Sequence, residues 1–232
     1  MHPPIEYLLF DLDNTLYSSR WGLEAAVSRR INGYLAARLG LPLEEARALR
    51  RERIETGRYG TTLEWLRAEK GFDDADTEEY LARIHPEDEA DALEADPALR
   101  SLLLSFSQPL GILTNSPREH ALRVLEKLGV LDLFPLPSIF DIRRNGFKGK
   151  PRDDVFRGVL DTLGVEAAAC LLVDDVARYV EGYRAIGGAG VYYDETGERP
   201  GVPGPRITAL EELIPLTGGC STAGVCSTAG GV

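Results

Sequence analysis

A pair of carboxylates follows the first apolar run of the chain. Residues 5–10 (Ile-Glu-Tyr-Leu-Leu-Phe) lead directly into Asp11-Leu12-Asp13. In an extended chain, side chains two residues apart point to the same side, so Asp11 and Asp13 face one way and Leu12 the other. Two carboxylates in this arrangement could act as a nucleophile and as a general acid and base. Asp-Asn after a strand is also ordinary turn chemistry.

Three more polar clusters follow along the chain. They are Thr114-Asn115-Ser116, Lys148-Gly149-Lys150-Pro151 and Asp174-Asp175. Taken singly, each also suits a helix cap or a surface loop. Because the carboxyl ends of parallel strands meet at one edge of a sheet, their joint placement favours a shared site. Crowded carboxylates raise one another's pKa unless a cation is present, and oxygen ligands suit Mg²⁺.

Short apolar runs alternate with helical patterns through the second half of the chain. We expect strands over residues 5–10, 110–113, 138–140, 170–173 and 190–193. Helices are expected over residues 118–128, 153–163 and 178–186, each closed by a glycine. This alternation predicts the α/β class, with a three-layer Rossmann-like core built on a parallel sheet.

The stretch between the first two strands has a different character. Residues 20–96 are rich in Ala, Leu, Glu and Arg, with apolar residues at helical spacing. They predict an α-helical cap inserted into a core made of residues 1–19 and 97–216. Residues 217–232 contain a repeat in which Cys220 and Cys226 each begin Cys-Ser-Thr-Ala-Gly. Such low-complexity sequence predicts a disordered tail rather than a metal site.

Composition limits the classes of partner. The 232 residues suffice for one core plus a small inserted domain, and the net charge of −11 disfavours nucleic-acid polymers and anionic membranes. A small anionic substrate stays compatible, because one metal ion and one lysine reverse the charge locally. No apolar run has membrane-spanning length, and residues 1–4 do not resemble a signal peptide. Three cysteines fit a reducing, cytoplasmic setting. The sequence does not indicate an oligomeric state.

The four clusters together resemble the four motifs of the haloacid dehalogenase-like hydrolase superfamily, in order and in spacing. The matching segments are residues 11–16 (Asp-Leu-Asp-Asn-Thr-Leu), 113–115 (Leu-Thr-Asn), 150–151 (Lys-Pro) and 173–175 (Val-Asp-Asp). A narrower likeness is to the pyrimidine 5′-nucleotidase group. It rests on residues 11–17, 59–63 and 96–100. The resemblance implies a Mg²⁺-dependent phosphatase with a helical cap, acting through an aspartyl-phosphate.

In that scheme Asp11 is the nucleophile, and Asp13 is the general acid and base, with a pKa raised by neighbouring carboxylates. Mg²⁺ is expected on Asp11, on the backbone carbonyl of Asp13 and on Asp174. Asp175 is expected to act through water or by orienting the ligands.

Lys150, the Thr114 hydroxyl and the Asn115 backbone N–H are expected to bind the phosphoryl oxygens. Lys148 competes for the lysine role, but Pro151 follows Lys150, as the family pattern has it.

Tyr17, Arg58, Tyr59 and Thr62 are the candidate substrate contacts from the hinge and cap, whereas Trp21 is expected only to pack. Arg178 suits either a contact with substrate or cap, or a surface position. His85 and His120 lie outside the motifs and are expected to be structural or exposed, and Cys170 is expected in a buried strand.

The presence of Asp13 disfavours a dehalogenase, because a halide leaving group needs no acid. A nucleoside 5′-monophosphate, pyrimidine ones first, is the expected substrate. A phosphosugar phosphatase or a phosphomutase is the alternative within the superfamily. A catalytically idle protein that binds phosphate or metal is the alternative from another class. A phospho-accepting receiver domain is disfavoured, because its accepting Asp lies in mid-chain and the module is about half this length.

Overall fold

The structure is a computed structural model that describes residues 3–199 and 201–218. Its centre is a parallel sheet of six strands in the order β3-β2-β1-β4-β5-β6. The strands are β1 (Tyr7–Phe10), β2 (Leu110–Leu113), β3 (Ile139–Phe140), β4 (Cys170–Asp174), β5 (Ala189–Tyr193) and β6 (Arg206–Ile207). The predicted α/β class is therefore confirmed. The sixth strand was not predicted, because two residues after a Gly- and Pro-rich stretch make no apolar run.

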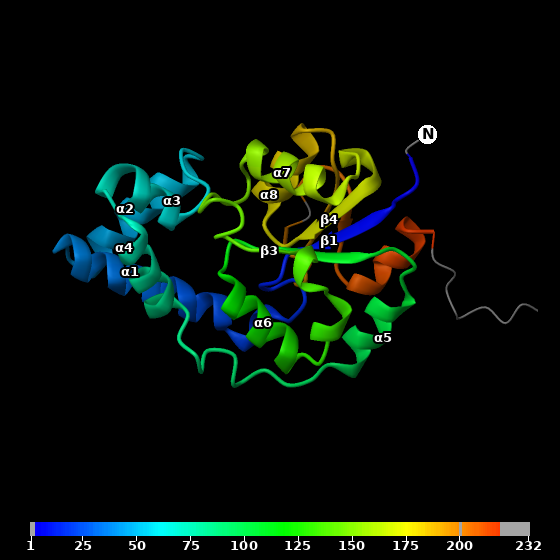
Figure 1. Cartoon of the computed structure of the whole chain (residues 1–232), viewed down its shortest axis with the longest axis horizontal. Helices are drawn as coiled ribbons and strands as arrows, with labels where there is room; N and C mark the ends of the chain where they lie inside the picture. Colours follow the sequence, from blue (N-terminus) through cyan, green and yellow to red (C-terminus); the bar gives the residue numbers. More distant parts are fainter. Residues whose placement is uncertain (1–2, 200, 219–232) are drawn as a thin grey trace, which may run out of the picture.

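Helices cover both faces of the sheet (Figure 1). On one face lie α7 (Asp153–Leu163) and α8 (Ala177–Ala185), and on the other α5 (Pro97–Ser105) and α6 (Arg118–Lys127). Five short 3-10 helices complete the elements of the described residues: Ser19–Trp21, Leu131–Leu133, Leu136–Ser138, Ala167–Ala169 and Leu210–Leu216. Helices α6, α7 and α8 match their predicted ranges to within one residue at each end.

Strand β1 shows why three layers form. All four of its residues are buried. Leu8 and Phe10 pack with α5 and α6, whereas Tyr7 and Leu9 pack with α7 and α8. Successive side chains of a strand point to opposite faces, so a continuous apolar run can be buried only between two helical layers. Cys170 is buried in β4, as predicted.

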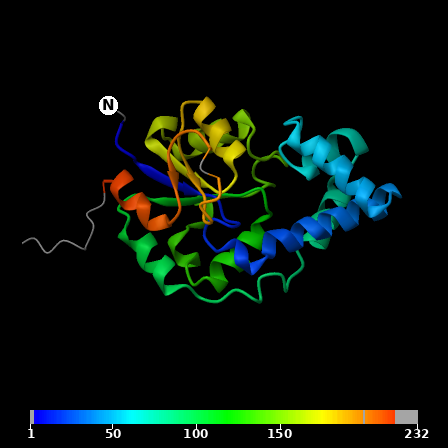
Figure 2. The same ribbon diagram turned by 180° about the vertical axis from the view of Figure 1, so that it is seen from behind.

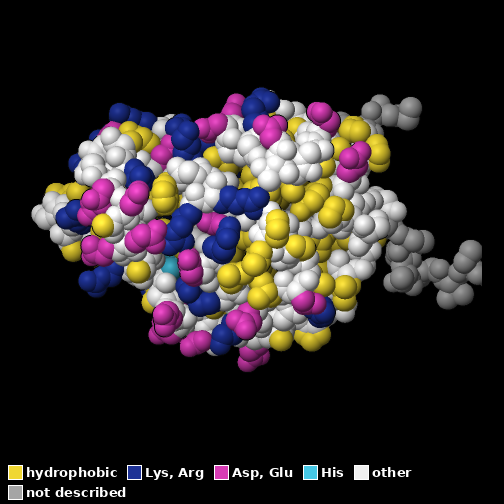
Figure 3. Space-filling view, viewed as in Figure 1, with side chains coloured by type: hydrophobic (Ala, Val, Ile, Leu, Met, Phe, Trp, Pro, Cys, Tyr) yellow, Lys and Arg dark blue, Asp and Glu magenta, His cyan; other side chains and the backbone are white. Residues whose placement is uncertain are grey.

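Four helices between β1 and α5 form a separate group, which we call the cap: α1 (Leu23–Leu39), α2 (Leu43–Glu55), α3 (Thr62–Lys70) and α4 (Asp74–Ile84). They share an apolar cluster of their own that includes Leu35, Trp65, Leu66 and Tyr80. Figure 2 shows α1 running from the sheet to the far end of the cap. In Figure 3, Lys and Arg side chains gather along the boundary between cap and core. The domain limits at residues 20 and 96 stay a prediction.

The chain end is described only as far as residue 218. Thr217 is buried, and its carbonyl accepts a hydrogen bond of 2.8 Å from Gln108 Nε2. The repeat that contains Cys220 and Cys226 lies outside the described residues, so the predicted disorder is untested. Within the described ranges, no helix has the length and apolar character needed to cross a membrane.

Candidate active site

Asp11 and Asp174 lie side by side at the carboxyl edge of the sheet. They follow the adjacent strand residues Phe10 and Val173, and the Asp11 N–H donates to the Val173 carbonyl at 2.8 Å. Lys150 reaches the same point from the loop before α7. Its Nζ lies 2.6 Å from Asp11 Oδ1 and 2.6 Å from Asp174 Oδ2. All three side chains are buried. These contacts bring together the first, third and fourth sequence clusters.

The electrostatics of this group follow from burial. Removal from water raises the pKa of Asp11 and of Asp174, and the Lys150 ammonium only partly opposes that rise. Burial would lower the pKa of Lys150, but its two carboxylate partners outweigh burial and raise it, so the ammonium stays charged. Burial, followed by the Asp174 charge, raises the pKa of Asp175 to about 7. Three carboxylates thus face one ammonium.

This donor set fits a divalent cation. Asp11, Asp174 and Asp175 each offer an oxygen, and these oxygens lie within 4.8 Å of one another. Oxygen ligands in a small number suit Mg²⁺, which keeps several of its waters for the substrate phosphate. The excess of carboxylate over ammonium supplies the charge that such an ion needs.

Asp13 is held by three donors. Its Oδ1 lies 2.5 Å from the Tyr17 hydroxyl and 2.7 Å from His120 Nε2, and its Oδ2 accepts from Ser116 Oγ at 3.0 Å. Burial opposes ionisation of Asp13, but the charge and hydrogen bond of His120, together with Tyr17, lower its pKa. The prediction that neighbouring carboxylates raise this pKa is wrong, because His120 and Tyr17 dominate.

The second sequence cluster fixes the loop that carries Lys150. Asn115 Oδ1 accepts from the Lys150 N–H at 2.8 Å, and Asn115 Nδ2 donates to the Tyr179 hydroxyl at 3.2 Å. A Cβ on Gly149 would lie 2.5 Å from Asn115 Oδ1, so only glycine allows this approach. Thr114 is buried, and its hydroxyl accepts from the Ser116 N–H at 3.0 Å.

A cavity of about 620 Å³ opens from these groups toward the cap. Core residues on its wall include Asp11, Asp13, Thr114, Asn115, Lys150 and Asp175, and cap and rim residues include Glu24, Arg50, Thr62, Tyr80, Tyr179 and Tyr193. Of the predicted substrate contacts, Thr62 lines this cavity, whereas Tyr17, Arg58 and Tyr59 are not among its lining residues.

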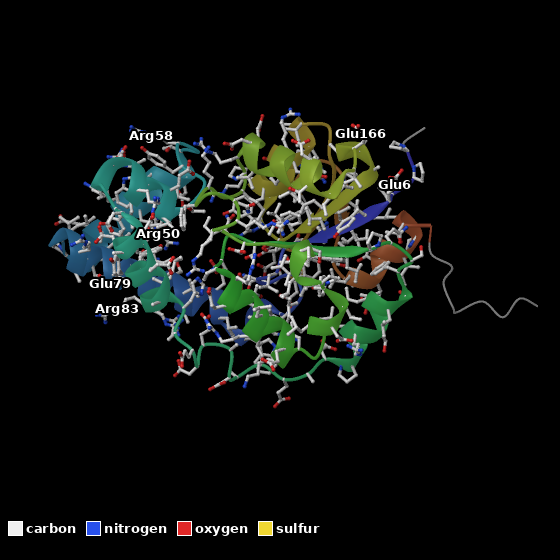
Figure 4. All side chains as sticks on the ribbon, in the orientation of Figure 1. Glu6, Arg50, Arg58, Glu79, Arg83 and Glu166 are labelled. Atoms are coloured by element: carbon white, nitrogen blue, oxygen red, sulfur yellow. The ribbon has the colours of Figure 1, made fainter. Side chains whose placement is uncertain are left out.

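The other predicted contacts have partners elsewhere. Arg58 Nη2 and the Tyr59 hydroxyl lie 2.9 and 2.8 Å from Glu69 Oε1. Figure 4 places Arg58 at the outer edge of the cap and Arg50 among the cap helices. Trp21 is 42% exposed and does not line the cavity. Arg50 was missed, because nothing in the local pattern of α2 separates it from the neighbouring arginines.

Two ambiguities of the sequence are resolved by position. Lys148 forms an exposed ion pair with Asp154 at 2.6 Å, so Lys150 alone lies in the carboxylate group. Arg178 lines the cavity, and its Nη1 donates to the Ile54 carbonyl of α2 at 2.7 Å, so it contacts the cap. His85 and His120 are both buried, and His120 contacts Asp13, which the sequence interpretation did not foresee.

A parallel sheet with an aspartate at the end of its central strand, an opposing buried lysine and a helical cap is the plan of a class of hydrolases. The family model described as haloacid dehalogenase-like hydrolase matches residues 5–187, and the chain belongs to this family. The predicted superfamily is therefore confirmed, while the pyrimidine nucleotidase likeness stays a prediction.

Individual relatives agree with that assignment. The chain is 28% identical over 218 residues to "Phosphatase MT3486" of Mycobacterium tuberculosis, covering 85% of this chain and 92% of that protein. It is 34% identical over 196 residues to "Phosphoglycolate phosphatase" of Rhodospirillum rubrum, covering 78% and 76%. The crystal structure of a HAD phosphatase from Thermococcus onnurineus matches with a TM-score of 0.62 and 26% identity, covering 93% and 99%. The protein is an enzyme, a phosphatase of this family.

Proposed function

We propose that the protein hydrolyses small phosphate monoesters in two steps, through an aspartyl-phosphate on Asp11. The observation that carries this proposal is the placement of Asp11 beside the Lys150 ammonium, on the wall of a cavity that Asp13 also lines. A carboxylate nucleophile and a second carboxyl group facing one cavity supply both the attacking atom and the proton.

In the first step an Asp11 oxygen attacks phosphorus, and the bond from phosphorus to the leaving oxygen breaks. Asp13 gives its proton to that oxygen, so an alcohol leaves. In the free protein Asp13 is ionised, but the negative charges of a bound phosphate monoester raise the pKa of Asp13 and favour the protonated form. In the second step Asp13 removes a proton from water, the water oxygen attacks phosphorus, and the bond to Asp11 breaks. Inorganic phosphate leaves, and both aspartates are regenerated.

Lys150 and Thr114 act on the phosphoryl group in this scheme. The Lys150 ammonium offsets the charge of Asp11 and of the phosphoryl oxygens, while the Thr114 hydroxyl and the Asn115 N–H donate hydrogen bonds. Asp11, Asp174, Asp175 and the backbone carbonyl of Asp13 are the groups that would hold Mg²⁺. When bound, Mg²⁺ stabilises the charge that spreads over the phosphoryl oxygens in the transition state.

A nucleoside 5′-monophosphate is the proposed substrate, with pyrimidine bases preferred. Two features support it. The cavity of about 620 Å³ is large enough to hold a nucleotide. Tyrosines from three elements lie on its wall: Tyr80, Tyr179 and Tyr193. Aromatic rings offer stacking surfaces and hydroxyl groups to a planar base.

We also propose a cytoplasmic location for the protein, which the low cysteine count of three supports.

A small phosphorylated carboxylic acid is the second candidate. One of the relatives reported above is named a phosphoglycolate phosphatase. Arg50 lines the cavity, and its guanidinium donates hydrogen bonds to Thr62, Ser28 and Asn32, none of which carries a charge. A guanidinium whose partners in the protein are uncharged could bind the carboxylate group of such a substrate.

A substrate panel separates the candidates. Phosphate release is measured with uridine, cytidine and adenosine monophosphates, phosphoglycolate and a hexose phosphate, each with Mg²⁺ and with a chelator. We expect the pyrimidine nucleotides to give the highest kcat/KM, and activity to be lost with the chelator. A preference for phosphoglycolate would establish the second candidate, and no release from any compound would contradict the proposal.

A further inference from the structure

A buried cluster of three residues, His85, Glu89 and His120, lies next to Asp13; His85 reaches the cavity wall, whereas Glu89 and His120 do not line the cavity. His120, near the start of α6, has no exposed surface, and its Nδ1 lies 2.7 Å from Glu89 Oε1. Glu89 and His85 belong to the segment between α4 and α5, which passes beneath α6 in Figure 1. His120 therefore links the Asp13 carboxyl to a buried glutamate through its two ring nitrogens.

Glu89 is itself fixed from several sides. Its Oε1 accepts a hydrogen bond of 2.7 Å from Arg123 Nη2, and its Oε2 lies 3.0 Å from His85 Nδ1. Arg123 follows His120 by one turn of α6, so helix and segment are joined at two points. With both oxygens held, Glu89 can keep the His120 ring in one orientation, as carboxylates commonly do for functional histidines.

A metal ion is a less suitable occupant of this cluster. The ligand atoms of His85, Glu89 and His120 are close enough to hold one. However, the Arg123 guanidinium already binds Oε1 of Glu89. Both ring nitrogens of His120 are also engaged by carboxylates. A cation bound to Glu89 would have to displace the Arg123 guanidinium and would then lie beside the His120 ring. Repulsion between positive charges opposes this arrangement.

We propose that His120, oriented by Glu89, is a positioning residue that holds the Asp13 carboxyl in the direction needed for proton transfer, a role that rests on the proposed function of Asp13. His120 Nε2 and the Tyr17 hydroxyl both hold Oδ1, which leaves Oδ2 beside Ser116 on the cavity wall. A general acid must lie within hydrogen-bond reach of the leaving oxygen, so a carboxyl free to turn would lose much of its effect.

A matched pair of variants tests this role. In His120→Gln the side-chain amide nitrogen can take the position of Nε2 and still donate to Asp13. In His120→Asn the amide nitrogen takes the position of Nδ1, toward Glu89, and the donor to Asp13 is lost. Two substrates are compared: uridine monophosphate, whose alkoxide leaving group needs a proton, and p-nitrophenyl phosphate, whose leaving group needs little help. The single-turnover rate of leaving-group release reports the first step alone.

For His120→Asn we expect this rate to fall on the order of 100-fold with the nucleotide, but only a few-fold with p-nitrophenyl phosphate. His120→Gln should recover most of the loss, and KM should change little. Glu89→Gln, which keeps the shape of the anchor, should show the same substrate dependence with a loss of about 10-fold. It serves as the second test if His120→Asn does not fold, as judged by thermal unfolding.

Two results would overturn the proposal. One is an equal loss for both substrates, and the other is the same rate for the Gln and Asn variants, because either would assign His120 to packing alone. Failure of the proposed function is distinguishable from these outcomes. In that case the unmodified protein would release no leaving group, or Asp13→Asn would react as fast as the unmodified protein.

Discussion

The Nζ of Lys150 lies 2.6 Å from Oδ1 of Asp11, although the two residues are 139 positions apart in the chain. The pair is buried, and Asp174 shares the same ammonium. A buried ion pair is expensive to assemble, because both charges leave water. The pair lies where strands β1 and β4 end together. Its contacts hold the carboxylate of Asp11, the proposed nucleophile, in one orientation.

Removing the ammonium should affect both stability and activity. Lys150→Met keeps the length of the side chain but leaves the Asp11 and Asp174 carboxylates buried without a partner. We expect turnover to be lost and the free energy of unfolding to fall by about 3 kcal/mol in a chelator. Lys148→Met is the matched control, because its exposed pair with Asp154 contributes roughly 0–1 kcal/mol. Urea unfolding and phosphate release measure both effects, and an active Lys150→Met protein would refute this role.

Replacing the nucleophile should separate chemistry from folding. Asp11→Asn keeps the shape of the side chain and removes the attacking oxygen, so we expect no turnover above background. Burial raises the pKa of Asp11, so a neutral amide at this position should leave the thermal unfolding temperature nearly unchanged. Asp161→Asn, at an exposed position of α7, is the control for a lost acidic charge. Retained activity in the Asp11 variant would remove the nucleophile from the account.

Replacing the acid and base should slow both steps. For Asp13→Asn we expect a loss on the order of 100-fold or more in leaving-group release and in phosphate release. Rapid-quench kinetics resolve the two rates. The Mg²⁺ concentration for half-maximal activity should stay the same, because the proposed Asp13 ligand is its backbone carbonyl. An unchanged first step would contradict the assignment of Asp13 as general acid.

The stability of the metal-free protein should depend on pH through Asp175. The pKa of this carboxyl is about 7 in the folded protein, against an ordinary value of 3.8. Between these values the folded protein binds more protons than the unfolded chain, so the free energy of unfolding falls as pH rises from about 4 to about 7. Unfolding in a chelator should show this fall in the unmodified protein and a smaller one in Asp175→Asn.

Mg²⁺ should reverse that trend, because it binds the ionised carboxylates. Added Mg²⁺ is therefore expected to stabilise the unmodified protein more at pH 7 than at pH 5. A stabilisation by Mg²⁺ that does not grow with pH would argue against a site made of Asp11, Asp174 and Asp175.

The sheet and the residues at its edge could be predicted from local patterns. Strand β1 is a continuous apolar run that Asp11 follows directly, and Asp174 is the last residue of β4, so the position of each strand determines the position of its aspartate. Alternation of strand and helix then brings these ends to one edge. Lys150 lies in a loop, and Pro151, which follows it as in the family pattern, pointed to it.

The surroundings of Asp13 could not be predicted in the same way. The burial of His120 could have been predicted, because His120 lies four residues before the buried Val124 on α6 and so shares its inner face. Its contact partners could not. Its partner Glu89 lies in an irregular segment with no repeating pattern, and only the folded path of that segment brings the two together. Among the predicted cap residues, Thr62 lines the cavity but Arg58 does not, because the packing of the cap helices places Arg50 rather than Arg58 on the cavity wall.

Trapping of the covalent intermediate tests the central claim most directly. The protein is mixed with Mg²⁺ and a substrate labelled in its phosphoryl group, and the reaction is quenched in acid while turnover proceeds. We predict an acid-stable, hydroxylamine-sensitive label on the peptide that contains Asp11, and none in Asp11→Asn. Label on another residue, or turnover with no labelled protein at any quench time, would contradict an aspartyl-phosphate at this position.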